Sequence, residues 1–267
     1  MRSRRWGIFL VGTLLALTVL GWFYTPYDPN ETRVVERFQP PGWPHLLGTD
    51  HFGRDVFSRI LWGARVSLAV GTAAVCVGAL VGVALGLAAG YFGGFWDELL
   101  MRVGTALQAL PSILLALLFA TIWSPGVPVV LWGIALGNIP SFLRVTRSQV
   151  LSIKERPYVE AARALGASDL RIVLRHILPN VGSALLVQFS VSLAGAILAE
   201  ASLSYLGVGL QPPHPSWGRM LREAQAFGSL APWLVLAPGL FIAAAVVGFN
   251  LLGDNWILGR ERLYKGE

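Results

Sequence analysis

The residues whose types and spacing favour a specific role lie between Glu160 and Pro179, a polar stretch with long apolar runs on both sides. Strong helix formers precede Gly166, which can adopt the left-handed conformation that ends a helix. Ser168 and Asp169 can then cap a second helix. The stretch therefore predicts a short helix–turn–helix that is exposed on one side of a membrane. We expect this helix–turn–helix to dock onto another protein.

The second helix of this stretch has an apolar side. Its apolar residues recur at helical spacing and are Leu170, Val173, Leu174 and Ile177. Pro179 is expected to end the pattern, because proline removes a backbone donor. The alternative is an ordinary basic loop between two spans.

No arrangement of residues for catalysis stands out. The four histidines (His45, His51, His176 and His214) are scattered and lack ligand spacing, so we expect no metal centre. Asp50 and Asp55 flank a glycine turn and are interpreted as caps and loop anchors. The single Cys76 lies in an apolar run and excludes a disulfide framework. The phosphate-binding pattern GxxxxGK[ST] is absent, so the chain supplies no nucleotide site and is expected not to be an enzyme.

Composition predicts a membrane protein, since 54% of the residues are hydrophobic and 13% are charged. Six apolar stretches approach or exceed the roughly 20 residues that cross a bilayer. They are 7–24, 68–90, 99–123, 127–143, 182–199 and 231–252. The stretch 127–143 is the least secure, because it is short and contains Asn138 and Pro140. The sequence therefore predicts an all-α membrane protein with six transmembrane helices.

The distribution of basic residues predicts the orientation. With six spans both termini share one side, and that side carries fourteen of the 21 Lys and Arg residues, including those of the stretch 160–179. Basic residues favour the cytoplasm, so the termini and this stretch are expected inside. The first span lacks a cleavage site and is interpreted as an uncleaved helix. The pI near 10 reflects this topology, and no nucleic-acid partner is expected.

The outer segment between the first two spans runs from Thr25 to Arg65. Its second half has an apolar side, with Val56 and Ile60, and a polar side, with Ser58 and Arg59. This pattern predicts an interfacial helix that leads into the second span.

Two further features of the spans indicate packing and a pathway. Glycines recur every four residues in the second span, at Gly78, Gly82, Gly86 and Gly90. They predict a helix-packing surface, within the subunit or against its partner. Glu200 is an acid near the outer end of the fifth span. It is expected to stabilise structure or a gate, with contact to substrate as the alternative.

Several motifs resemble one family of transport proteins. They are Glu160-Ala161-Ala162 with Gly166 and Ile177-Leu178-Pro179, Leu47-Gly48-Thr49-Asp50 with Gly53-Arg54-Asp55, Gly90-Tyr91-Phe92-Gly93-Gly94, the run 198–209, and Asn250 to Asp254. Together they resemble the permease subunits of ABC importers, in the C-type branch that serves dipeptides, oligopeptides and nickel. The resemblance covers about 45–254.

The resemblance implies a type I ABC importer permease in the cytoplasmic (inner) membrane of a prokaryote. Residues 1–66 would form the first helix and outer loop, and 67–267 a five-helix core with the coupling loop 150–180. The residues implied to couple to an ATPase are Glu160, Ala161, Ala162, Gly166, Ala167, Ile177 and Pro179.

The resemblance also implies the partners. They are a second, homologous permease, one or two cytoplasmic ATPases that hold ATP and Mg²⁺, an extracytoplasmic solute-binding protein and the lipid bilayer. The expected cargo is a di- or oligopeptide, with nickel or a nickel chelate as the alternative. A secondary transporter is disfavoured because the spans contain almost no buried charge.

Overall fold

The computed structural model describes the backbone of residues 2–265 and the side chains of residues 5–254. Within that range the chain is helical, and its only β-type pairing is an isolated bridge between Thr49 and Asp55. The long helices are α1 (Arg2–Phe23), α2 (Val56–Phe92), α5 (Val127–Ile153), α8 (Leu178–Leu206) and α10 (Trp233–Lys265). The shorter ones are α3 (Gly94–Gln108), α4 (Ser112–Ile122), α6 (Pro157–Ala164), α7 (Asp169–Ile172) and α9 (Trp217–Ala224).

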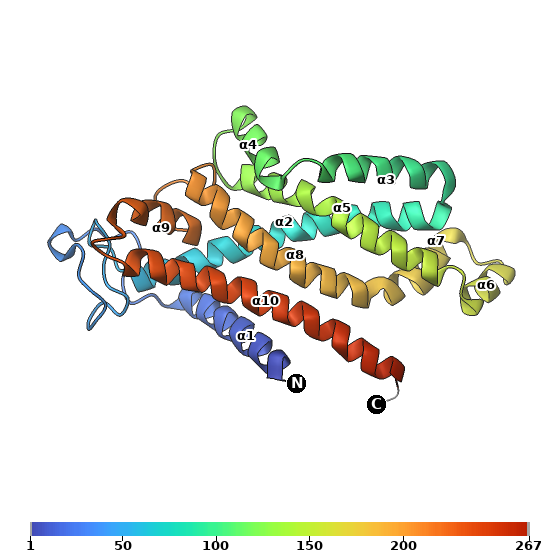
Figure 1. Ribbon diagram of the computed structural model, residues 1–267, viewed down its shortest axis with the longest axis horizontal. Coiled ribbons are helices and arrows are strands. Elements are labelled where there is room, and N and C mark those ends of the chain that lie inside the picture. The colour runs from blue at the N-terminus through green and yellow to red at the C-terminus, as the bar shows by residue number, and fades with distance from the viewer. Residues whose placement is uncertain (1, 266–267) are drawn as a thin grey trace.

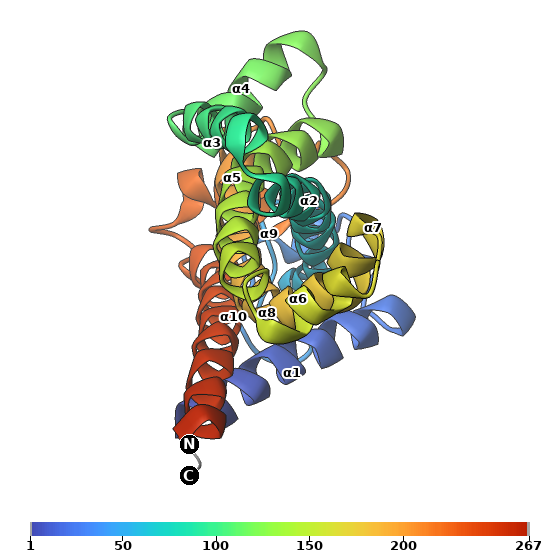
Figure 2. The same cartoon turned by 90° about the vertical axis from the view of Figure 1, so that its right-hand side faces the viewer.

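The prediction of an all-α membrane protein is confirmed. The five long helices are apolar and long enough to cross a membrane, and the bent pair α3–α4 makes a sixth span if it is counted as one. α2, α5 and α8 pack together, α10 lies on α8, and α1 flanks α10 and α2 (Figures 1 and 2). α3 and α4 lie on the opposite side of the bundle from α1 (Figure 2).

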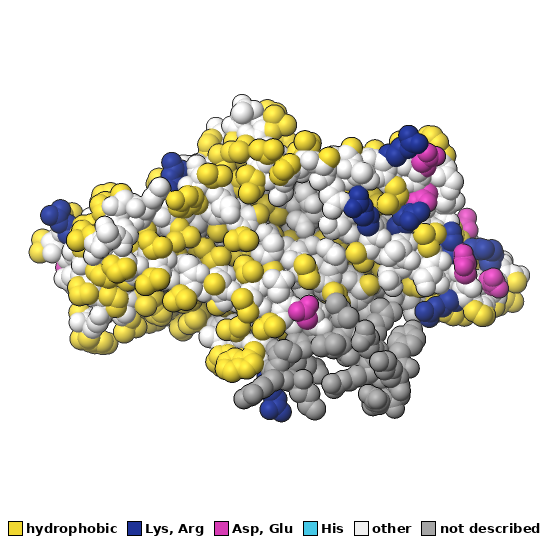
Figure 3. All heavy atoms as spheres, in the orientation of Figure 1, with side chains coloured by type: hydrophobic (Ala, Val, Ile, Leu, Met, Phe, Trp, Pro, Cys, Tyr) yellow, Lys and Arg dark blue, Asp and Glu magenta, His cyan; other side chains and the backbone are white. Residues whose placement is uncertain are grey.

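The two ends of the bundle differ in what they carry. Residues 24–55 and α9 form one end, and α6 and α7 project at the other (Figure 1). α1 starts near the middle of the long axis, and α10 ends between the middle and the α6–α7 end (Figure 1). On the face shown in Figure 3, most charged side chains gather at the α6–α7 end, and apolar side chains are spread over the opposite half. The basic side chains predicted at the termini (Arg2, Arg4, Arg260, Arg262 and Lys265) lie outside the described side chains.

The third predicted span, 99–123, is wrong as a continuous helix. The chain leaves α3 after Gln108 and starts α4 at Ser112, and the two helices are bent by 82°. Pro111 occupies the N-cap position of α4. Proline disfavours the helical conformation in the residue before it, here Leu110, so the helix breaks at this point.

The fourth span is longer than predicted. α5 continues from Val127 to Ile153, ten residues past the expected end at Leu143. Arg144 and Arg147 therefore lie on a helix and not in a loop. Pro140 is inside this helix and fully packed, and its neighbours in the bundle keep the helix continuous.

The helix predicted before the second span is present and is continuous with that span. α2 begins at Val56, directly after Asp55, and runs for 37 residues without a break. Ser58 and Arg59 are buried, because residues 25–50 and α9 cover what the sequence indicated as a polar side. The capping role predicted for Asp55 is confirmed: its Oδ2 accepts a hydrogen bond from the backbone N–H of Ser58 at 2.7 Å.

The four regularly spaced glycines of α2 lie against α5. A Cβ on Gly78 would come within 2.7 Å of the carbonyl oxygen of Ala135, and one on Gly82 within 2.6 Å of the carbonyl oxygen of Ile139. Gly86 and Gly90 are equally close to Thr146 and Val150. The two helices thus meet backbone to backbone, which only glycine permits here.

α4 packs on α5 through a second pair of glycines. A Cβ on Gly133 would come within 2.5 Å of the Ala116 Cβ, and one on Gly137 within 2.8 Å of the Ser112 Cβ. The spacing of Gly133 and Gly137 is the small-xxx-small pattern of helix contacts in membranes.

Candidate functional site

The segment 157–179 forms the predicted helix–turn–helix at one end of the molecule. α6 begins with Pro157, whose fixed φ suits a first helical position. Gly166 has a φ of 79°, in the left-handed region. The N–H of Ala167 bonds to the carbonyl of Ala162 at 3.1 Å, and the N–H of Gly166 bonds to that of Arg163 at 3.0 Å. This pair of bonds is the Schellman motif that glycine commonly completes at the end of a helix.

A small apolar core holds this segment to the end of α5. Val159, Ile172 and Ile177 are fully buried and pack with Val150 and Ile153. Ile177, which the resemblance placed among the coupling residues, therefore packs inside the segment and cannot contact a partner directly.

The outward side of the same segment is both apolar and charged. Leu165 is 89% exposed, Leu170 is 68% exposed and Leu174 is 52% exposed. Glu160 and Ala161 are exposed beside them. Exposed leucines beside charged residues at the end of a bundle are typical of a surface that contacts another protein.

One hydrogen bond ties the segment to α2, and a second ties the residue just after α5 to the same helix. The hydroxyl of Tyr91 donates to Oδ1 of Asp169 at 2.6 Å, and Nζ of Lys154 donates to the carbonyl of Gly90 at 3.0 Å. Ser168 occupies the N-cap of α7, but its side chain makes no capping bond. Sequence reasoning missed these ties, because they join residues 64 or more positions apart.

Pro179 does not end the helix as predicted. α7 passes through a π-helical turn, Val173–Ile177, directly into α8, and Pro179 lies in the first turn of α8. A first-turn position needs no N–H donor, so proline is accepted there. The segment is therefore continuous with the long helix α8, and this continuity joins the outward surface to the membrane-spanning bundle.

Glu200 lies inside the bundle, six residues before α8 ends at Leu206. Its side chain is fully buried, and the hydroxyl of Ser204 donates to Oε1 at 2.7 Å. Ser67 of α2 and Ser216, just before α9, lie beside the carboxylate. The carboxylate thus faces three serines from separate elements and not the interface or an arginine.

A buried network of charges holds the end of the molecule opposite α6 and α7. Glu223 Oε2 lies 3.0 Å from Nη2 of Arg59 and 2.7 Å from Nη2 of Arg54. Its other oxygen lies 2.9 Å from Nε of Arg219, and Asp50 Oδ2 lies 2.6 Å from Nε of Arg54. The side chain of Arg59 is 2% exposed. No local pattern indicates Glu223 as a partner, because it is 164 positions from Arg59.

His51 packs against the same network. Its ring stacks on Phe227 at 5.0 Å and contacts Phe52 at 4.1 Å between ring centroids. Burial lowers the pKa of His51 below its ordinary value of 6.5. The carboxylates of Asp50 and Glu223 oppose this shift, whereas Arg54 and Arg59 add to it. The neutral ring is therefore favoured in the folded protein.

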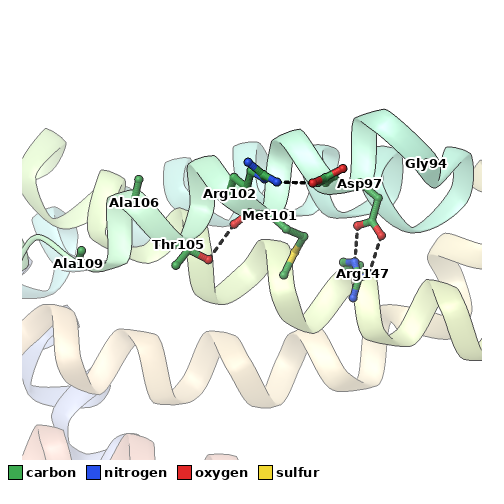
Figure 4. Close-up of a pocket in the computed structure, with 9 residues that line it drawn as sticks. Gly94, Asp97, Met101, Arg102, Thr105, Ala106, Ala109 and Arg147 are labelled. Carbon is green, nitrogen blue, oxygen red and sulfur yellow. Dashed lines mark hydrogen bonds and ion pairs between the residues drawn. The ribbon is translucent and has the colours of Figure 1, made fainter.

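A hollow with a volume of about 730 Å³ opens beside α3 (Figure 4). It is lined by residues of α3, by Ala109 directly after that helix, and by Arg147 of α5. Arg147 binds Asp97 through two hydrogen bonds, one of them 2.6 Å from Nη2 to Oδ2. A smaller hollow of about 200 Å³ lies between α4, α5 and α8. Among the described residues, no group of three or more His, Cys, Asp or Glu side chains could hold a metal ion.

The fold is that of an ABC importer permease. Two solved structures of the MetNI methionine ABC transporter in inward-facing conformations have TM-scores of 0.62 and 0.61 to this chain, at 17% and 18% identity. The match to the first of these structures covers 75% of this chain and 95% of the chain in that structure. At this identity the likeness establishes the fold alone.

The sequence comparisons establish the family. Residues 82–258 match the family described as "Binding-protein-dependent transport system inner membrane component". A protein of Brucella suis biovar 1, named for a peptide transport system permease, is 44% identical over 95% of this chain and 86% of its own length. The glutathione transport system permease protein GsiD of Escherichia coli O6:K15:H31 is 43% identical over 91% and 80%. The chain belongs to this family of transporter permease subunits.

Proposed function

We propose that this chain is a permease subunit through which peptides cross the cytoplasmic membrane, driven by ATP hydrolysis on partner subunits. The relatives named for peptide and glutathione transport support a peptide cargo over nickel, since glutathione is itself a tripeptide. The full assembly would contain a second homologous permease, one or two ATPases that hold ATP and Mg²⁺, and an extracytoplasmic solute-binding protein.

The observation that carries the proposal is the outward surface of segment 157–179. Its leucines and Glu160 are exposed, while its apolar core joins it to α5 and its π-helical turn joins it to α8. A rigid body docked on an ATPase at this surface would transmit the closure of the ATPase to two membrane helices. Residues Glu160, Ala161 and Gly166 lie on the proposed interface, whereas Ile177 and Pro179 position it.

We also propose that the termini and this surface face the cytoplasm. The basic asymmetry of the sequence supports this orientation. With Cys76 changed to Ala, a cysteine at Ser168 should be shielded from an impermeant thiol reagent in intact cells, and one at Asn30 should react. Reaction of the Ser168 site from outside would reverse the orientation.

The coupling role is tested with Gly166→Val and Glu160→Lys. Valine at a φ of 79° is strained, and alanine there is strained less, so Gly166→Val should be the more severe substitution. We expect both Gly166→Val and Glu160→Lys to insert normally but to lose uptake and the stimulation of ATPase activity by loaded binding protein. The measurement is the ATPase rate in reconstituted vesicles with and without that protein.

Gly239→Val provides the matched control for insertion, because no neighbouring atom lies within 4 Å of a Cβ built on Gly239. Full stimulation and uptake by both coupling variants would show that the segment does not couple the ATPase to the bundle.

A further inference from the structure

Helix α3 has two unlike long sides. One side carries Trp96, Leu99 and Val103, all apolar and between 39% and 57% exposed. The other side lines the larger hollow and carries Asp97, Glu98, Arg102 and Thr105 (Figure 4). The apolar side suits lipid, whereas exposed charges at membrane depth do not. The polar side must therefore face water or protein.

The depth of the polar side follows from its neighbours along the helix. Phe95 is 72% exposed and Trp96 is 57% exposed, near the start of α3, and exposed aromatic residues are typical of the membrane interface. At 1.5 Å per residue, Thr105 lies about 14 Å further along the helix axis. The hollow thus extends from the interface into the hydrocarbon depth.

Arg144 is a half-buried cation of α5 that adjoins this hollow. Its Nη2 donates to the hydroxyl of Thr105 at 3.2 Å. Its neighbours are already paired, Arg147 with Asp97 and Arg102 with Glu98. Within the described side chains, no carboxylate lies at ion-pair distance from Arg144, so the group carries three arginines against two acids. One positive charge is available to a ligand.

The smaller hollow lies near the middle of the long helices α5 and α8. It is lined by Ser112 of α4, Gly137 and Asn138 of α5, and Ser192 of α8, together with small apolar residues. Ala109 of the larger hollow and Ser112 of the smaller one are three residues apart, on either side of the break at Pro111. The two hollows therefore adjoin where α3 and α4 diverge.

Small residues and short hydroxyl and amide groups give the smaller hollow the chemistry of a peptide main chain. The Asn138 amide is oriented by donating to the carbonyl of Ile134 at 2.8 Å, and the Ser192 hydroxyl accepts from Gln188 at 3.0 Å. These groups offer hydrogen bonds without a large side chain that would select for sequence.

We propose that the two hollows form this subunit's part of the translocation path, and that Arg144 binds the carboxylate of a peptide as it passes. The inference rests on the proposed function, because it takes a peptide as the cargo. The mid-membrane groups contact the main chain, and the cationic group near the inner end attracts the terminal carboxylate. Selectivity by size and charge then arises in the permease itself.

The path is tested without any substrate. In a Cys76→Ala background, Thr105→Cys and Val103→Cys place a thiol on the two sides of the same helix. In reconstituted complex, a charged, membrane-impermeant methanethiosulfonate applied from the α6–α7 side should modify Thr105→Cys at least tenfold faster than Val103→Cys. Equal rates, or faster reaction at Val103, would overturn the assignment of the polar side to the path.

The role of Arg144 is tested by uptake of a peptide with a free carboxylate. Arg144→Gln should lower uptake about tenfold while stimulation of ATPase activity by loaded binding protein persists, and Arg144→Lys should recover most of the uptake. Unchanged uptake by Arg144→Gln would overturn the role, and so would a parallel loss of ATPase stimulation, which would mark a structural residue.

Two further outcomes show whether Arg144 binds the carboxylate of a peptide or the phosphate of a lipid headgroup. A defect of Arg144→Gln that disappears in vesicles of neutral phospholipid would make the cationic group a lipid headgroup site and overturn the peptide assignment. If the wild-type complex takes up no peptide at all, the proposed function fails and the Arg144 role falls with it. The labelling contrast between Thr105 and Val103 decides the path independently.

Discussion

Two regions of the molecule are held together by opposite means. One is the end that carries α9, and the other is the contact between α2 and α5. At that end, residues 50–59 join α9 through buried charges, with Glu223 surrounded by Arg54, Arg59 and Arg219. Between α2 and α5 no charge is needed, because glycine backbones of one helix meet carbonyl oxygens and small side chains of the other.

The difference follows from the solvent around each region. Outside the bilayer, charged groups can be brought together from distant parts of the chain because each is hydrated until it is buried. Within the bilayer, lipid tails are as apolar as the helices, so close packing of small residues provides the attraction. The stability of the end that carries α9 is therefore sensitive to the loss of a single charge. The α2–α5 contact is sensitive to the addition of a few atoms.

The largest effect is expected from Glu223→Gln. The change leaves three arginines around a neutral group, and breaking a buried pair costs about 3–5 kcal/mol of unfolding free energy. Thermal unfolding of the purified subunit in detergent should show a marked loss of stability. Glu31→Gln, in an ion pair with Arg33 whose side chain is 42% exposed, should have no measurable effect. Equal shifts for the two variants would show that the buried network is not what holds this end.

A smaller loss is expected from Gly82→Leu. A Cβ at this position already comes within 2.6 Å of the Ile139 carbonyl and 2.7 Å of the Phe142 Cβ, so leucine must separate α2 from α5. Overpacking of this kind costs about 1–3 kcal/mol, and Gly82→Ala should cost less than leucine. Gly12→Leu in α1, where nothing lies within 4 Å of a Cβ, is the control. The yield of purified protein and its thermal unfolding are measured for the Gly82 variants and for Gly12→Leu. If the two leucine variants behave alike, the glycines are not needed for close contact.

The smallest effect is expected from pH at His51. Its folded pKa is lowered by burial, so the unfolded state binds a proton more readily than the folded state. Its contribution to stability is therefore complete above the unfolded value near 6.5 and is lost as the pH falls below it. The protection factors of the backbone amides of residues 45–55, which are corrected for the intrinsic pH dependence of hydrogen exchange, should fall between pH 7.5 and 5.5. His51→Gln should remove this part of the pH dependence, and an unchanged pH profile in that variant would assign the effect to another group.

Much of the fold follows from local sequence. The apolar runs gave the spans, Gly166 gave the turn between α6 and α7, and Asp55 gave the cap of α2, because each depends on neighbours within a few residues. The glycine spacing of α2 likewise indicated a packing side, since a period of four follows one side of a helix. The helix that packs on that side, α5, could not be identified from the sequence, because the glycine pattern of one helix does not indicate which other helix contacts it.

The sequence by itself determined that this is a helical membrane protein with an exposed helix–turn–helix, since hydropathy and backbone preference act locally. Tertiary structure alone decided that α3 and α4 diverge at Pro111, that Pro179 lies in the first turn of α8, and that Ile177 is buried. A proline can break, bend or begin a helix, and the surrounding contacts select among these outcomes. Tertiary structure also brought Glu223 to Arg59 and Arg144 to Thr105, because pairing between distant residues depends on how whole helices pack.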